Sequence, residues 1–80
     1  MHAPYSQPVI RLRKDRWDRH MNAKELRTHP DRAKVLGMSR QAVYRIESGE
    51  TKPGTAFIAA VLDVFSDLRF EDVFEIKRVA

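Results

Sequence analysis

Apolar side chains in the second half of the chain recur at helical spacing. Between Thr55 and Phe65 they stand at i, i+3, i+4 and i+7, which predicts an amphipathic helix capped by Thr55. The side chains expected to face the core are those of Ile58, Val61, Leu62 and Phe65. A second apolar stripe on this helix, Phe57, Ala60 and Val64, fits either a dimer contact or burial beneath the two ends of the chain.

Two shorter runs alternate between apolar and polar residues, which is the spacing of a β-strand. Residues 9–13 form the first run, and residues 74–79 form the second, with Phe74 and Ile76 on one side. We expect the two runs to pair as a small antiparallel ribbon beside the helices, with a last helical turn leading into Phe74.

Spacing and turn residues between these runs predict three further helices. The first spans about residues 14–26. The second follows Thr28, whose hydroxyl can cap it, and ends at Gly37, because glycine readily adopts the left-handed backbone that ends a helix. The third is expected over residues 40–48, with Ser39 as its cap.

The second and third helices have the layout of a helix-turn-helix, which places its second helix in the DNA major groove. Ala33 is small where the two helices cross, and Val43 and Ile46 point back toward the core at helical spacing. The outward face of the third helix carries Arg40, Gln41, Tyr44 and Arg45.

From Met38 to Ile76 the chain resembles the DNA-binding domains of the lambda repressor and Cro-like (XRE-type) helix-turn-helix family. The resemblance rests on an Ile-Glu-x-Gly end to the recognition helix at residues 46–49, a basic loop with Lys52 and Pro53, and the amphipathic helix that follows. It covers about residues 28–76. The resemblance implies a mostly α fold of four to five helices, here with the small ribbon added, and double-stranded DNA as the partner.

Side-chain chemistry predicts which residues of the third helix read bases. Arginine donates two hydrogen bonds to guanine O6 and N7, and glutamine pairs with adenine N6 and N7. We therefore expect base contacts from Arg40 and Gln41 in its first turn. Tyr44 and Arg45, one turn on, are expected to reach bases or the flanking phosphates.

A second set of residues is expected to hold the DNA phosphates. Helix N-termini offer free N–H groups to an anion, and the loop after the recognition helix matches family positions that contact the backbone. His29 stands where the family often has a phosphate-contacting glutamine. The expected phosphate contacts are Thr28, His29, Ser39, Thr51 and Lys52.

The resemblance also implies a structural role for Glu47. Its family counterpart commonly pairs with an arginine of the first helix, for which this chain offers Arg13, Arg16 and Arg19. Arg32, like most of the remaining cations, is expected to lie on the surface.

Charge is divided unevenly along the chain. Residues 1–45 hold 11 Lys and Arg against 4 Asp and Glu, a charge of +7, whereas residues 46–80 hold 4 against 7, a charge of −3. The basic half therefore carries the helix-turn-helix, which favours one face turned toward a polyanion.

Composition narrows the remaining possibilities. Eighty residues suit one small domain, and we expect residues 1–8, which are polar and rich in proline, to be a disordered arm before a single domain at 9–80. The chain has no cysteine, no apparent signal peptide or membrane span, and no ligand spacing among its three histidines. We expect no enzyme activity, metal, other cofactor, small-molecule substrate or membrane contact, and a cytoplasmic, nucleoid-associated protein of a bacterial host.

The function that fits these features best is sequence-specific transcriptional regulation. Small size suggests a phage Cro or immunity repressor that blocks transcription at an operator, and a homodimer is expected because one recognition helix reads too few base pairs. An antitoxin-type regulator and a protein-interaction helix-turn-helix module are the alternatives, with a non-specific DNA coat as a third.

Overall fold

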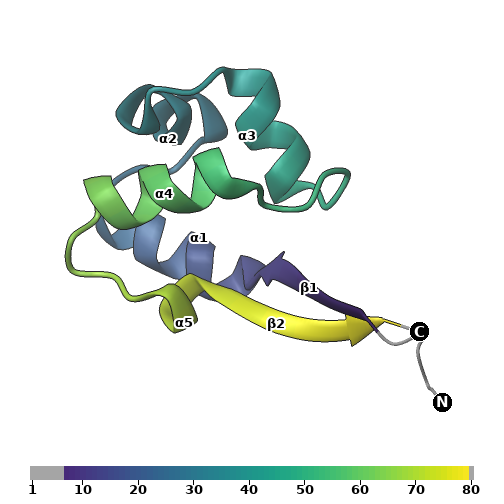
Figure 1. Ribbon diagram of the computed structural model, residues 1–80. Coiled ribbons are helices and arrows are strands. Elements are labelled where there is room, and N and C mark those ends of the chain that lie inside the picture. Colours follow the sequence, from purple (N-terminus) through teal and green to yellow (C-terminus); the bar gives the residue numbers. More distant parts are fainter. Residues whose placement is uncertain (1–6, 80) are drawn as a thin grey trace, which may run out of the picture.

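The computed structural model describes residues 7–79, which form five helices and a two-stranded antiparallel ribbon (Figure 1). The elements in chain order are β1 (Gln7–Leu12), α1 (Lys14–Ala23), α2 (His29–Leu36), α3 (Arg40–Glu47), α4 (Thr55–Val64), α5 (Phe70–Val73) and β2 (Phe74–Val79). The predicted fold class, a mostly α domain with a small ribbon, is therefore confirmed. Each of the helices within residues 7–79 falls short of the length and apolar content that a membrane crossing needs.

Aromatic side chains form the centre of the core. The ring of Phe57 on α4 lies between that of Trp17 on α1 and that of Phe74 on β2, with ring centroids 5.5 and 6.0 Å apart. All three side chains are fully buried. Because Phe57 packs against Phe74 at the base of the ribbon, it is unavailable as a dimer contact. Ala60 is half-buried and Val64 is 39% exposed, so burial beneath the chain ends accounts for Phe57 but not for the whole stripe.

The core face of α4 differs from the predicted one. Phe57, Val61 and Phe65 are buried, and Ile58 and Leu62 pack against the core as predicted but are only half-buried. The reason is that neighbours lie on more than one side of α4 (Figure 1), so that the buried face is centred on Phe57 and Val61. The predicted cap was also wrong, since α4 begins after Gly54, which has extended backbone, and Thr55 is already its first residue.

The first strand of the ribbon spans Gln7–Leu12, so it begins two residues and ends one residue before the predicted range of 9–13. β1 and β2 pair in register from Gln7 opposite Val79 to Leu12 opposite Phe74, so the strand includes two residues that were assigned to the N-terminal arm. Arg13 lies outside the strand, and its backbone N–H donates instead to the carbonyl of Val73 at 2.8 Å. The other residues of the predicted arm lie outside the described part of the chain.

Helix α1 is shorter than predicted. It ends at Ala23 because Glu25 takes a left-handed backbone conformation, with φ of 63°. The N–H of Leu26 then turns back to the carbonyl of Met21 at 2.8 Å. Leu26 nevertheless packs against the core, so its predicted burial is correct, and only the predicted helical backbone of residues 24–26 is wrong.

The helix-turn-helix has the caps that the sequence predicts. Thr28 Oγ1 accepts a hydrogen bond from the Asp31 N–H at 3.3 Å, and Ser39 Oγ accepts one from the Ala42 N–H at 3.1 Å. Gly37 ends α2 in the left-handed conformation, with φ of 69°. These three residues fix where α2 begins, where it ends and where α3 begins.

Substituting Gly37 with valine is expected to destabilise the domain by about 1 kcal/mol or more, since a β-branched residue is strained at this φ. A Cβ at Gly37 would meet no atom within 4 Å, so the cost comes from the backbone alone. Gly37→Asn is the matched control because asparagine tolerates the left-handed region. Thermal unfolding checks the order of stability, and a valine variant as stable as the asparagine variant would contradict it.

Candidate nucleic-acid interface

Helix α3 presents one polar face to solvent and one apolar face to the core. Val43 and Ile46 are buried against the other helices. The side chains exposed on the opposite face are Arg40, Gln41, Tyr44 and Arg45. Among the described residues, none engages these arginine and glutamine side chains in a hydrogen bond or ion pair. They are therefore available to an external ligand.

Tyr44 is positioned by the start of α2. The rings of His29 and Tyr44 are 5.3 Å apart between centroids and inclined at 55°. Tyr44 is 48% exposed, while His29, the first residue of α2, is half-buried. This contact joins a predicted phosphate contact to a predicted base contact, a relation that the sequence did not indicate.

Two hydroxyl groups of the predicted phosphate set already serve as helix caps. Thr28 and Ser39 each accept a hydrogen bond from the first turn of the helix that follows. Both residues are exposed, and their hydroxyl hydrogens remain available to donate to an anion. The N–H groups at the start of α2 and at the start of α3 can also bind an anion next to the exposed face of α3.

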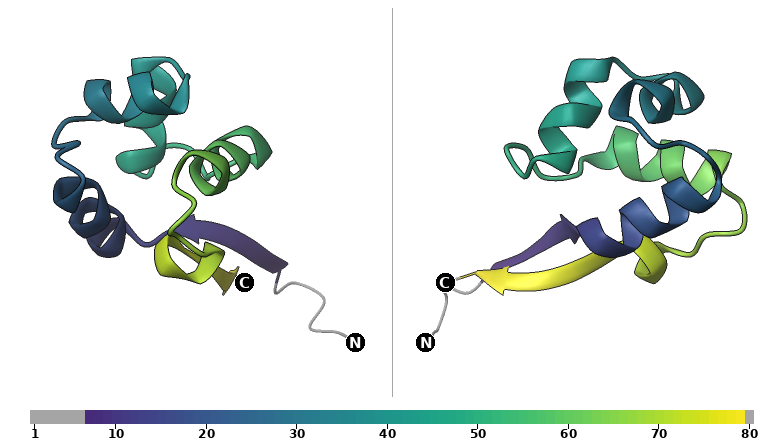
Figure 2. Two further views of the ribbon diagram at one scale, coloured as in Figure 1. Left: turned by 90° about the vertical axis from the view of Figure 1, so that its left-hand side faces the viewer. Right: turned by 180° about the vertical axis from the view of Figure 1, so that it is seen from behind.

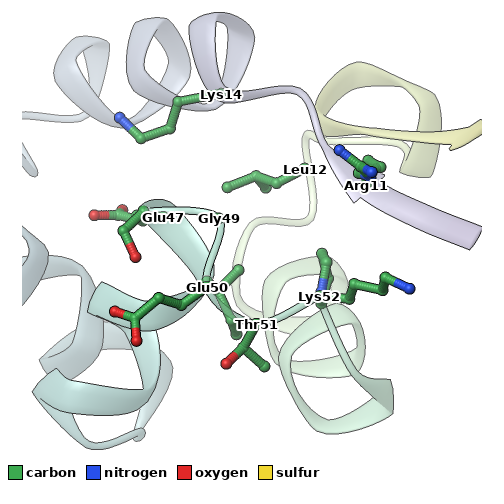
Figure 3. A pocket seen from close by; sticks show the side chains of 11 residues that line it. Arg11, Leu12, Lys14, Glu47, Gly49, Glu50, Thr51 and Lys52 are labelled. Carbon is green, nitrogen blue, oxygen red and sulfur yellow. The ribbon is translucent and has the colours of Figure 1, made fainter.

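The remaining predicted phosphate contacts lie in the loop after α3. Thr51 and Lys52 are exposed, and the Thr51 N–H donates to the carbonyl of Arg45 at 3.1 Å, which holds the loop against the end of α3. The loop forms one wall of an open groove of about 430 Å³, and β1 and the start of α1 form the other. Figure 3 shows Arg11 and Lys52 at one end of this groove and Glu47 toward the other.

An ion-pair network under the helix-turn-helix joins α1, α2 and α3. Its centre is Arg32, which is 4% exposed. The guanidinium donates from Nη1 to Glu47 Oε2 and to Asp18 Oδ1, at 2.8 Å each, and from Nε to the carbonyl of Leu26 at 2.7 Å. The indole Nε1 of Trp17 donates to the same Glu47 oxygen at 2.7 Å.

This network corrects two predictions. Arg32 is buried, although it was expected on the surface, and Glu47 pairs with this α2 arginine instead of with an arginine of α1. The physical reason is that α1 places Trp17, and not an arginine, next to the Glu47 carboxylate. The indole N–H of Trp17 and the guanidinium of Arg32 from α2 both donate to Glu47 Oε2. Asn22 Oδ1 accepts a further, longer hydrogen bond from Arg32 Nη2 at 3.3 Å.

The network shifts the acidity of its members. Burial raises the pKa of Asp18, but hydrogen bonds from Lys14 and Arg32 outweigh it, so that the pKa of this carboxyl is lowered overall. Burial lowers the pKa of Arg32, but its hydrogen bonds to Glu47 and Asp18 outweigh this effect, so that the pKa is raised overall. The two carboxylate partners therefore hold the buried guanidinium in its charged form.

Sequence reasoning did not identify Arg32 or place Arg11 and Lys52 along the same groove. Arg32 lies four residues before Leu36, which is buried in the core, and this helical phase was the available signal. Arg11 carries no comparable signal, because its position depends on how the ribbon packs beside the loop after α3.

The fold and the exposed face of α3 define a helix-turn-helix protein, and comparison with known proteins agrees. Residues 33–71, from the middle of α2 into α5, match the family model described as Helix-turn-helix. These residues belong to the XRE-type helix-turn-helix family, the lambda repressor and Cro-like class, and the chain is a DNA-binding regulator of that type. Comparison with the curated proteins and with the solved structures gives no match.

Proposed function

We propose that this chain is a sequence-specific transcriptional regulator that inserts α3 into the major groove of double-stranded DNA. The observation that carries the proposal is the exposed face of α3, where arginine and glutamine side chains have no partner within residues 7–79. In this reading Arg40 and Gln41 contact base edges, and Tyr44 and Arg45 contact bases or nearby phosphates. A protein-interaction surface would have little use for two arginines and a glutamine at these positions.

Phosphate contacts on both sides of α3 would fix its orientation without reading sequence. On one side are Thr28 and His29 at the start of α2, with Ser39 at the start of α3. On the other side are Thr51 and Lys52, in the loop that is held against α3 by the hydrogen bond from the Thr51 N–H to the backbone carbonyl of Arg45. Phosphate contacts at both ends of a short recognition helix would set its angle in the groove.

The proposed mode of regulation is occupation of an operator by a homodimer, which blocks transcription in the manner of a small phage Cro or immunity repressor. A dimer presents two recognition helices to two half-sites, about one helical turn apart. The second candidate is an antitoxin-type regulator, which would add a bound partner protein; the acidic second half of the chain favours it.

Selection of bound duplexes from a random DNA pool at near-physiological salt tests the proposal. Two inverted half-sites are the expected outcome and would define the operator. A single half-site would contradict the homodimer, and the absence of any enriched sequence would contradict sequence-specific binding.

Substituting Lys52 with alanine is expected to weaken binding to all DNA sequences equally and to reduce the slope of log K against log salt by about one unit. The reason is that an exposed loop lysine neutralises a phosphate and reads no base. Titrations of one operator and one scrambled duplex over a range of salt measure both quantities. Lys34→Ala, an exposed lysine on α2, is the control, and a change in preferred sequence for the Lys52 variant would count against a phosphate contact.

A further inference from the structure

The contact between His29 and Tyr44 joins the start of α2 to the exposed face of α3. The two ring centroids are 5.3 Å apart, a distance typical of packed aromatic rings. Figure 2 shows α2 and α3 together at one end of the molecule in both views, away from the ribbon. The contact therefore lies within the helix-turn-helix, between a residue expected to hold a phosphate and one expected to read a base.

The polar groups of both rings are available to DNA. Among residues 7–79, no hydrogen bond or ion pair engages the imidazole of His29 or the hydroxyl of Tyr44. Tyr44 is 48% exposed, and an exposed side chain without a restraint samples several rotamers and loses that freedom on binding. The contact with His29 supplies such a restraint before any DNA is bound.

Tyr44 shares the exposed face of α3 with the residues expected to read bases. It follows Arg40 by four residues and Gln41 by three, and helical spacing makes side chains at these intervals neighbours. His29 contacts the Tyr44 ring from α2. If that ring moved, the surface that α3 presents to the base edges would change, although no residue of α3 had been substituted.

We propose that His29 is a positioning residue for sequence recognition, because its ring holds the ring of Tyr44 in the orientation in which Tyr44 reads a base. This inference rests on the proposed function and adds a second role to the phosphate contact expected of His29. The phosphate contact uses an imidazole nitrogen, whereas the positioning role uses the ring. Residue 29 therefore affects which base is preferred at one position without touching that base.

Two substitutions of His29 separate the two roles. His29→Phe keeps a ring against Tyr44 and removes both nitrogens, whereas His29→Gln keeps a hydrogen-bonding group and removes the ring. Selection from the random DNA pool with Tyr44→Ala first identifies the position that Tyr44 reads. His29→Gln is expected to lower discrimination at that same position by about 2- to 10-fold. His29→Phe is expected to keep the motif and to lower affinity for all sequences equally.

A contact that only packs α2 against α3 would give a different result. Loss of the ring would then lower thermal stability and the affinity for every sequence together, and the motif would not change. The double variant His29→Gln with Tyr44→Ala is expected to select the same motif as Tyr44→Ala alone, since the positioning role is lost with the tyrosine ring. Lys34→Ala, an exposed residue of α2, is the control and should leave the motif unchanged.

The outcomes distinguish this proposal from the proposed function. An unchanged motif in His29→Gln would overturn the positioning role, and so would a motif flattened equally by His29→Phe or a Tyr44→Ala variant that flattens no position. Each of these results leaves base reading by the first turn of α3 intact. A wild-type chain that enriches no sequence would instead contradict the proposed function, and the positioning role with it. His29→Ala also removes the ring and must select the same motif as His29→Gln, so the result does not depend on one variant folding.

Discussion

Substitution of Arg32 by alanine is expected to reduce the free energy of unfolding by about 3–5 kcal/mol, the cost of breaking a buried ion pair by removing one partner. Glu47, whose side chain is 10% exposed, would keep its charge without its cation. The carbonyl of Leu26 would lose its donor as well. Small domains have only about 5–15 kcal/mol of stability in total. Urea denaturation followed by Trp17 fluorescence measures the loss.

Two control variants separate the lost charge from lost packing. Arg16→Ala removes an exposed arginine of α1 and is expected to change stability by no more than about 0.5 kcal/mol. Arg32→Lys keeps the charge, but its single nitrogen cannot reach the separate acceptors that Nε, Nη1 and Nη2 of the guanidinium contact, so an intermediate loss is expected. An Arg32→Ala variant as stable as Arg16→Ala would show that the network contributes nothing.

The pH dependence of unfolding provides a further control. Because the pKa of Asp18 is lower in the folded protein, the unfolded state binds its proton first as the pH falls. The stabilisation by Asp18 is therefore fully present above its unfolded pKa and is lost as the pH falls through the lowered folded value. Arg32→Ala removes one cause of the lowered pKa, so the variant should lose less stability in that acidic range than the wild type.

The helix-turn-helix was predictable because its determinants are local. Thr28 and Ser39 cap helices whose N–H groups lie three residues away, and Gly37 adopts the backbone that a helix end needs. The outward face of α3 followed from helical period alone, since the buried positions Val43 and Ile46 fix the exposed ones. Features of this kind depend on neighbours within one or two turns.

Predictions failed where the outcome depended on segments far apart in the chain. The partner of Glu47 depends on how α1 and α2 pack against α3, and this packing brings Arg32 and Trp17 within hydrogen-bond distance of its carboxylate. For Phe57 the sequence left open whether the side chain is a dimer contact or is buried beneath the chain ends, and the contact with Phe74 decides for burial. Ile76 has the pattern of a buried strand residue, and its exposure follows from the length of the ribbon beyond the helices.

Substitution of Arg40 or Gln41 by alanine is expected to relax sequence preference at one base-pair position each. A bidentate contact to a base is worth about 1–3 kcal/mol of discrimination, which corresponds to about 5- to 150-fold in relative affinity. Both side chains are exposed and lie in the first turn of α3, after the cap Ser39. Neither packs against the core, so the helical content of each variant should match that of the wild type.

The measurement is repeated selection from the random DNA pool with each variant, alongside Lys52→Ala as the matched control. A residue that reads a base should flatten the enriched motif at one position and leave the others unchanged, whereas a phosphate contact should lower affinity without altering the motif. Arg40 and Gln41 are adjacent on one helix turn, so their affected positions should be neighbours within the same half-site. An unchanged motif with equal loss on every sequence would place both side chains on the backbone and would assign base reading to Tyr44 and Arg45, one turn further along α3.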